Sequence, residues 1–148
     1  MDETAGITQA AEGREGISWS ILGQTYVPKS QTDRSFAWHA TFPPGTFVPP
    51  HRHTTQDEYL YILEGTLDFW LEGEETNAGP GDTVRLPMGG AHGIFNKSDA
   101  TVRCLFWVAP TGRLPELFQA LHDMPEQIPE KVVELAAKYD VFFLPPPE

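Results

Sequence analysis

The sequence predicts an all-β domain, an antiparallel sandwich or barrel, with short helices at its C-terminal end. Between Ile17 and Val108 the chain consists of short segments rich in Trp, Phe, Tyr, Val, Ile and Leu. Glycine and proline turns, such as Pro43-Pro44-Gly45, separate these segments. Short apolar segments at close, regular spacing are typical of antiparallel β-folds. After Pro110 the apolar residues change to helical spacing, and the chain has no internal repeat.

The apolar segments define the predicted strands. They cover 18–22, 35–42, 58–63, 66–72, 83–86, 92–95 and 101–108. A first helix is predicted by apolar residues at helical spacing, which are Leu114, Leu117, Phe118 and Leu121. Pro115 fits this helix because its first turn tolerates proline. A second helix is expected from Pro129 to Tyr139, before an apolar strip at 142–144 and a rigid proline run at 145–147.

These elements divide the chain into three parts. Residues 1–16 form a polar extension that is either mobile or paired with a partner chain. Residues 17–110 form the β-barrel, and residues 111–148 form a helical segment and a proline-rich tail that pack on the barrel. A length of 148 residues suits a single domain with one sizeable core.

Composition narrows the partners and the compartment. Ten basic and 21 acidic residues give a formal charge of −11, which repels phosphate backbones and anionic lipids. Neither nucleic acid nor a membrane is therefore an expected partner. The single cysteine, Cys104, lies in an apolar run and is expected to be a buried structural thiol. One cysteine, no recognisable signal peptide and no apolar stretch of membrane-spanning length predict a cytoplasmic protein.

Three histidines and one glutamate form the candidate functional site. His51 and His53 are two residues apart, so in a strand they face the same side. Glu58 is five residues further on, which a continuous strand would place on the opposite face. The polar turn at 54–57 can change this parity and bring Glu58 back toward the histidines. His92 follows a sharp turn at 87–90 and can complete the site.

Imidazole nitrogens and a carboxylate are ligands for a divalent transition metal. The same set accepts iron, nickel, manganese, cobalt or zinc, so the sequence predicts one such ion without selecting among them. Four protein ligands leave two open positions on an octahedral metal. Because binding requires neutral imidazoles, metal affinity is expected to fall as pH drops through the histidine range.

The two segments resemble the two signature motifs of the cupin superfamily. The matching positions are Gly45, His51, His53, Glu58 and Gly65 in the first motif, and Gly81, Pro87, Gly89, His92 and Asn96 in the second. The resemblance implies a double-sheet jelly roll with His51, His53, Glu58 and His92 as ligands of a metal inside the barrel. The C-terminal sequence is also similar to tails of small single-domain cupins related to quercetin dioxygenase.

The resemblance leaves three classes of function open, because cupins span all of them. The favoured one is a quercetinase-like dioxygenase for a small aromatic or enolic molecule, in which Glu58 is either a ligand only or also takes a substrate proton. The second is a non-redox isomerase, lyase or hydrolase that uses the metal to polarise a carbonyl or activate water. The third is a small-molecule-binding cupin without catalysis.

Several other residues have two interpretations. Five strand aromatics either line a substrate cavity or form the core, namely Phe36, Trp38, Phe69, Phe95 and Phe106. Strand alternation places Leu60 and Ile62 on the same face as Glu58, and Tyr59 and Tyr61 on the other. These tyrosines beside Trp70 are a candidate surface for the homodimer that cupins commonly form. His39 and His122 lie outside both motifs and are expected to be structural.

Overall fold

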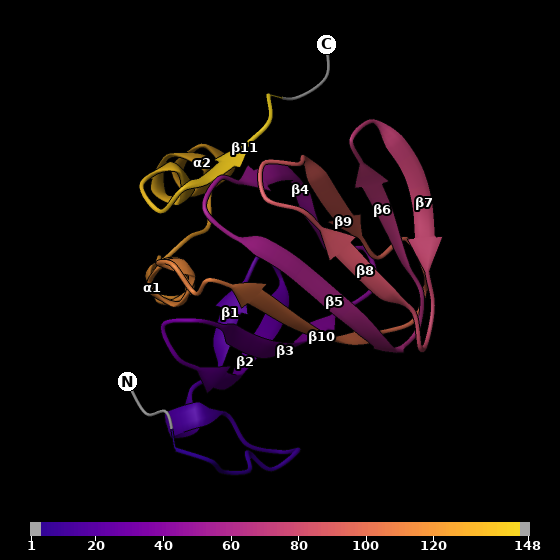
Figure 1. The fold of residues 1–148 in the computed structure, drawn as a ribbon. Coiled ribbons are helices and arrows are strands. Elements are labelled where there is room, and N and C mark those ends of the chain that lie inside the picture. The colour runs from indigo at the N-terminus through magenta and orange to yellow at the C-terminus, as the bar shows by residue number, and fades with distance from the viewer. Residues whose placement is uncertain (1–3, 146–148) are drawn as a thin grey trace.

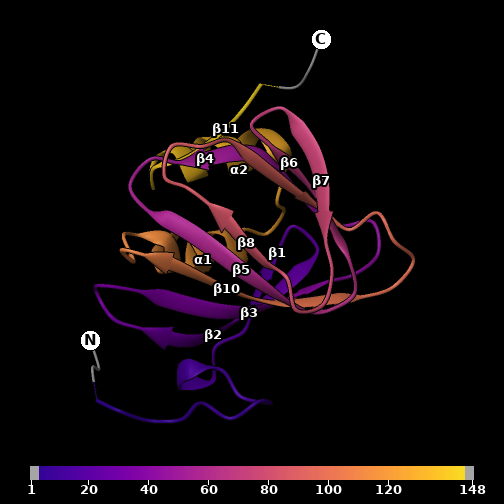
Figure 2. The same cartoon turned by 45° about the vertical axis from the view of Figure 1, so that its right-hand side comes forward.

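Two antiparallel sheets face each other in the computed structural model, which describes residues 4–145 (Figures 1 and 2). In spatial order, the first sheet contains β1 (Trp19–Ile21), β2 (Gln24–Gln31), β3 (Phe36–Phe42), β10 (Val102–Ala109), β5 (Asp57–Glu64) and β8 (Thr83–Leu86). The second contains β11 (Val141–Phe143), β4 (Phe47–His53), β9 (His92–Phe95), β6 (Leu67–Leu71) and β7 (Glu74–Ala78). This arrangement confirms the expected all-β jelly roll with short helices.

The core lies between the two sheets and is built by strand alternation. Every second residue of β3, from Phe36 to Phe42, is buried, and the residues between them are only half-buried. Trp38 stacks on its register partner Phe106 of β10, with ring centroids 5.0 Å apart and an interplanar angle of 9°. Phe36, Trp38, Phe69 and Phe106 are all buried. Phe95 is only half-buried and stacks on Phe47, which is 48% exposed.

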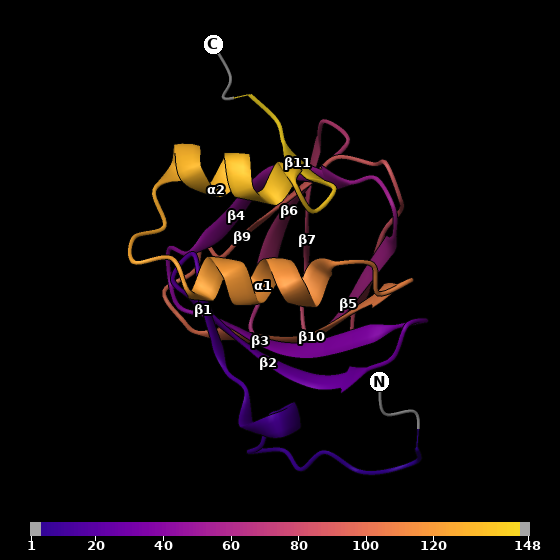
Figure 3. The same ribbon diagram turned by 90° about the vertical axis from the view of Figure 1, so that its left-hand side faces the viewer.

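Two helices cover the side of the barrel at which the sheets separate (Figure 3). α1 (Leu114–His122) buries the four apolar residues that predicted it, and α2 (Pro129–Ala137) buries two, Val132 and Ala136. Both helices have proline in the first turn. A hydrogen bond connects β1 to α1, in which Trp19 Nε1 donates to Gln119 Oε1 at 2.9 Å. A short 3-10 helix, η1 (Arg14–Gly16), precedes the barrel.

Four strands were not predicted, because their sequences lack a clear apolar alternation or are very short. β2 contains Pro28 and β4 contains Pro49 and Pro50. The pairing register shifts at both places, between Pro28 and Ser30 and between Val48 and His51. Such irregularities allow proline within a sheet. β7 is mostly exposed and polar, and β11 has only three residues.

The predicted tyrosine surface needs one correction. Leu60 and Ile62 are fully buried as expected, and Tyr61 is 39% exposed. Trp70, however, lies on β6 in the other sheet and does not join the tyrosines. Strand parity gives the face of a residue but not the sheet to which its strand belongs. The aromatic neighbour of Tyr59 is instead Trp107 of β10, stacked at 5.4 Å.

The described part of the N-terminal extension contacts β2 through Lys29. The Lys29 ammonium donates to the carbonyl oxygens of Gln9, Ala10 and Glu12 at 3.0, 3.1 and 2.6 Å. Residues 1–3 and the end of the proline run, 146–148, lie outside the described residues. Within the described part of the chain, no helix combines the length and the hydrophobicity that crossing a bilayer requires.

Candidate metal centre

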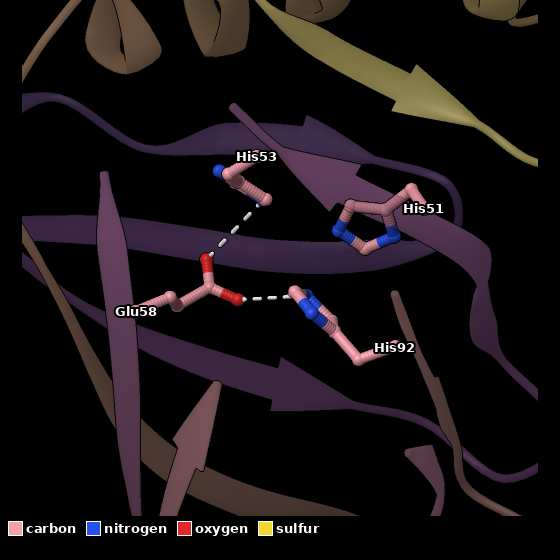
Figure 4. Close-up of side chains that lie close together, drawn as sticks. All are labelled: His51, His53, Glu58 and His92. Carbon is pink, nitrogen blue, oxygen red and sulfur yellow. Dashed lines mark ion pairs between the residues drawn. The ribbon is translucent and has the colours of Figure 1, made fainter. Parts of the chain in front are cut away.

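The four predicted site residues meet between the sheets. β4 contributes His51 and His53, β9 contributes His92, and β5 of the opposite sheet contributes Glu58. All four are buried, with 2% to 5% of their surface exposed. The turn between β4 and β5 carries the chain from one sheet to the other, which is why Glu58 faces the histidines despite its odd spacing. Figure 4 shows the four side chains directed toward a common point.

The donor atoms lie at distances that suit a shared ion. Each residue offers one donor atom within 4.8 Å of the other three. The two oxygens of Glu58 face different imidazoles, with Oε1 3.6 Å from His53 Nε2 and Oε2 3.2 Å from His92 Nε2. His51 lies directly opposite His92 in the β4–β9 pair, and their ring centroids are 4.4 Å apart.

Hydrogen bonds fix the orientation of two of the imidazoles. His51 Nδ1 lies 2.8 Å from the carbonyl oxygen of Pro49, and His53 Nδ1 lies 2.7 Å from Gln56 Oε1. Because these oxygens can only accept, Nδ1 carries the proton in both rings and Nε2 keeps its lone pair. Such outer contacts typically orient histidine ligands of metal ions. In His53 the free Nε2 is the atom that faces Glu58.

The electrostatic environment favours neutral histidines and an ionised glutamate. Burial lowers the pKa of His51 well below its usual value, and the neighbouring His92 and His53 lower it further. Burial also lowers the pKa of His53, although Glu58 opposes this shift. For Glu58, burial would raise the pKa, but His53 and His92 together bring it to about 2. These protonation states are the ones that metal binding requires.

His92 supplies an independent test of whether the site fits a metal. Both of its ring nitrogens are buried. Within the described residues Nδ1 has no hydrogen-bond partner, and Nε2 faces the Glu58 carboxylate at 3.2 Å. Buried polar atoms without a partner are rare and costly. An ion at the centre of the cluster would be shared by Nε2 of His92 and the Glu58 carboxylate that it faces. Three imidazoles and one carboxylate also form a donor set that suits a divalent transition metal.

Comparison with known proteins places this geometry in a family. Residues 38–108 match the cupin domain family, and this segment contains all four clustered residues. The chain belongs to the cupin superfamily. This cupin is 33% identical over 82 residues to the tetracenomycin polyketide synthase protein TcmJ of Streptomyces glaucescens, a match that covers 55% of each chain. It is 25% identical over 118 residues to quercetin 2,3-dioxygenase of Bacillus subtilis, covering 79% of this chain and 34% of that one.

A solved structure supports the fold assignment. KdgF from Halomonas sp. superposes with a TM-score of 0.65 and 22% identity, covering 72% of this cupin and 94% of that chain. Identity at this level shows a shared fold alone. The match to the first curated relative spans about half of that relative's length, and the match to the dioxygenase spans a third. The activities of those whole proteins are therefore not transferred by the comparison itself.

The cluster of this cupin borders an internal cavity of about 50 Å³. The sheets contribute the aromatic side chains of Tyr26, Trp38 and Phe106 to its wall, and α1, α2 and β11 contribute apolar residues, including Phe143. Among the described residues that line the cavity, the only charged or imidazole groups belong to the cluster. The strand aromatics were expected either to line a cavity or to form the core. Trp38 and Phe106 do both, because they are buried in the core and also line this cavity.

The residues expected to be structural lie away from the cluster's centre. Asn96 is buried and donates to the carbonyl oxygens of Phe42 and Ala100 at 2.9 and 2.8 Å. His39 lies on β3, and Nδ1 of His122 accepts a hydrogen bond from the backbone of Ser20. Sequence reasoning missed Gln56, which holds His53. It also missed Phe143, whose ring lies 5.3 Å from that of His51.

Proposed function

We propose that this cupin binds one divalent transition metal through His51, His53, Glu58 and His92 and acts as a quercetinase-like dioxygenase. The substrate would be a small aromatic or enolic molecule. The observation that carries the proposal is the meeting of three buried imidazoles and a carboxylate beside a cavity whose other walls are apolar. Iron, nickel, manganese, cobalt and zinc all suit this donor set.

A bound ion would supply Lewis acidity. The protein residues set the remaining conditions. Gln56 and the Pro49 carbonyl hold two imidazoles in the tautomer that presents Nε2. The aromatic walls exclude water, and when movement of a wall enlarges the small cavity they offer packing surfaces to a planar molecule. Since the described lining has no charged group outside the cluster, an uncharged substrate fits best.

Glu58 is the proposed base as well as a ligand. In contact with His53 and His92 its pKa is about 2, so the carboxylate is ionised but weakly basic. Burial acts in the opposite direction and raises the pKa. A small movement away from the histidines would therefore make Glu58 more basic, and it could then take the proton of an acidic enol or phenol.

The comparison with quercetin 2,3-dioxygenase supports this chemistry, because the match covers most of this chain. The similarity to a polyketide synthase protein favours a second candidate. This is a non-redox reaction of an enolisable molecule, in which the same metal polarises a carbonyl group. Both candidates use the same four ligands and differ in whether oxygen is consumed.

Oxygen uptake separates the two candidates. The protein would be reconstituted with each metal in turn and supplied with flavonols, β-diketones and catechols in an oxygen electrode. The dioxygenase proposal predicts oxygen consumption that requires both metal and substrate. Turnover of the same substrate under strict anaerobiosis would reject it and select the non-redox reaction.

We also propose that two copies of this cupin form a homodimer through the outer face of the six-stranded sheet. The stacked pair Tyr59 and Trp107 lies on this face beside Tyr61 and Leu63, which are 39% and 46% exposed. Exposed aromatic and aliphatic side chains in one area are typical of interfaces. Sedimentation velocity of the wild type and of Tyr61→Arg tests this, since the variant should sediment as a monomer. An unchanged sedimentation coefficient would reject this surface.

A further inference from the structure

An apolar groove lies on the outside of the molecule, next to the C-terminal segment. Its volume is about 640 Å³, and its walls include Phe47 and Pro49 of β4 and Pro129 and Val133 of α2. Phe47 and Val133 are large apolar residues with 48% and 43% of their surface exposed. None of the described residues that line the groove is charged. The groove is therefore suited to an apolar, uncharged molecule.

The groove and the internal cavity share part of their walls. Leu22, Val132 and Phe143 line both spaces. These three side chains therefore form a partition between the outside groove and the cavity beside the cluster. Phe143 joins this partition to the proposed ligands, because its ring lies 5.3 Å from that of His51.

The two volumes differ in what they can hold. The internal cavity of about 50 Å³ has room for little more than a water molecule or two. Pockets for small organic ligands usually measure about 300–1,000 Å³, and the groove, at about 640 Å³, falls in this range. An aromatic molecule thus fits the groove as it stands. From the groove it reaches the cluster when the partition moves.

The partition belongs to one edge of the barrel wall. Phe143 lies on β11, a strand of three residues at the edge of its sheet that pairs with β4 (Figure 3). Val132 lies on α2, which buries two residues, whereas α1 buries four. Elements with few buried contacts open locally at lower free-energy cost than the core strands. The segment from α2 to β11 is thus the part of the wall that can open locally.

We propose that the groove is the entrance site for an uncharged, apolar small molecule, and that Phe143 is the gate between this site and the metal centre. The proposal rests on the proposed function, since it supplies the route by which the substrate reaches the cluster. It makes Phe143 a residue that determines which molecules enter. The formal charge of −11 fits this selectivity, because it disfavours anionic ligands.

The groove is tested by placing a charge in it. 3-Hydroxyflavone, an uncharged fluorescent flavonol, would be titrated against the metal-loaded and the metal-free protein. Val133→Arg should weaken its binding by about tenfold or more, because the ligand would lie against a desolvated charge. The matched control is Phe142→Arg, since Phe142 is 40% exposed but does not line the groove. This control should bind like the wild type.

The gate is tested by comparing variants of two adjacent residues of β11. Phe143→Ala opens the partition, whereas Phe142→Ala alters the adjacent residue, which lines neither space. Diethyl pyrocarbonate modifies accessible neutral imidazoles, and mass spectrometry measures its rate at His51 in the metal-free protein. Phe143→Ala should raise this rate by about tenfold, a change equivalent to 1.4 kcal/mol. Phe142→Ala should leave it unchanged. Phe143→Leu, a milder change, serves if the alanine variant does not fold.

Each of these measurements has an outcome that would overturn the proposal. It is overturned if the wild type does not bind 3-hydroxyflavone, if Val133→Arg binds as tightly as the wild type, or if both arginine variants lose affinity equally. Equal modification of His51 in the Phe143 and Phe142 variants would overturn the gate. Failure of the protein to take up any metal would reject the proposed function instead, and the metal-free titration and modification would still judge the groove and the gate.

Discussion

Gln56 Oε1 accepts a hydrogen bond from Nδ1 of His53 at 2.7 Å, and the same Gln56 side chain is held from its other end. Its amide nitrogen donates to the carbonyl oxygens of Pro110 at 2.9 Å and Thr111 at 3.1 Å. These two bonds determine which end of the amide faces the histidine. The segment that joins β10 to α1 thus fixes the orientation of a proposed metal ligand on β4.

Replacing Gln56 with leucine should weaken metal binding about 10–100-fold, because His53 loses the group that orients it. It should also reduce the free energy of unfolding by about 1–3 kcal/mol, since buried polar groups lose their partners. Chelator competition and urea unfolding measure the two effects. Gln24→Leu is the matched control, because Gln24 is equally buried but bonds to Tyr26. Equal losses of metal affinity in the two variants would contradict this role.

Glu58→Gln separates the two roles proposed for this residue. The amide oxygen still offers a ligand atom, so the variant should retain much of its metal. It cannot take a substrate proton, so turnover should fall by about 10²–10⁴-fold. Elemental analysis and oxygen uptake report the two properties. Glu64→Gln, at the exposed end of the same strand, should behave like the wild type. Full activity in Glu58→Gln would show that Glu58 is a ligand only.

The metal-free protein should lose stability on acidification. The pKa values of His51 and His53 are lowered in the folded state, chiefly by burial. Below about pH 6.5 the unfolded chain therefore takes up protons that the folded chain does not, which favours unfolding. Stability is fully present above this pH and declines below it. A further decline is expected below about pH 4.5, because Glu58 titrates at about 2 in the folded state.

Urea unfolding of chelator-treated protein between pH 5 and 8 measures this dependence, since the range of about pH 5–8 brackets histidine titration. His51→Asn should flatten the curve, because one of the two buried imidazoles is gone. A wild-type stability that stays constant or rises on going below about pH 6.5 would contradict the account.

The aromatic wall of the cavity should also support the fold. Phe106→Ala removes a buried ring that stacks on Trp38 and should cost about 3–5 kcal/mol. Phe95→Ala removes a half-buried ring that stacks on the exposed Phe47, so its cost should be clearly smaller. Thermal and urea unfolding compare the two variants. Equal losses of stability would mean that the stack around Trp38 is not part of the main core.

The sequence predicted the ligand cluster better than the complete sheet topology. His51 and His53 have the same-face spacing of a strand, and the polar turn before Glu58 indicates a change of direction. β4 itself was not predicted, because Pro49 and Pro50 disfavour a strand, and the structure accommodates them at a register shift. The placement of Trp70 beside the tyrosines was wrong because local alternation carries no information about which sheet a strand joins.

Contacts between distant segments account for what the sequence did not reveal. Gln56 is one of several polar residues in a turn, and its role depends on carbonyl groups 54 and 55 residues further along the chain. Phe143 belongs to a predicted apolar strip, but only the pairing of β11 with β4 places it opposite His51. The role of each residue follows from tertiary pairing, which periodicity alone does not specify.

Metal content measured on chelator-free protein tests the central claim most directly. Elemental analysis of the wild type should give about one transition-metal ion per chain, as four converging ligands require. His53→Ala should contain much less, because the cluster loses a ligand, whereas His39→Ala, which alters a histidine outside the cluster, should match the wild type. Normal metal content in His53→Ala, or no uptake by the wild type of iron, nickel, manganese, cobalt or zinc, would contradict the account.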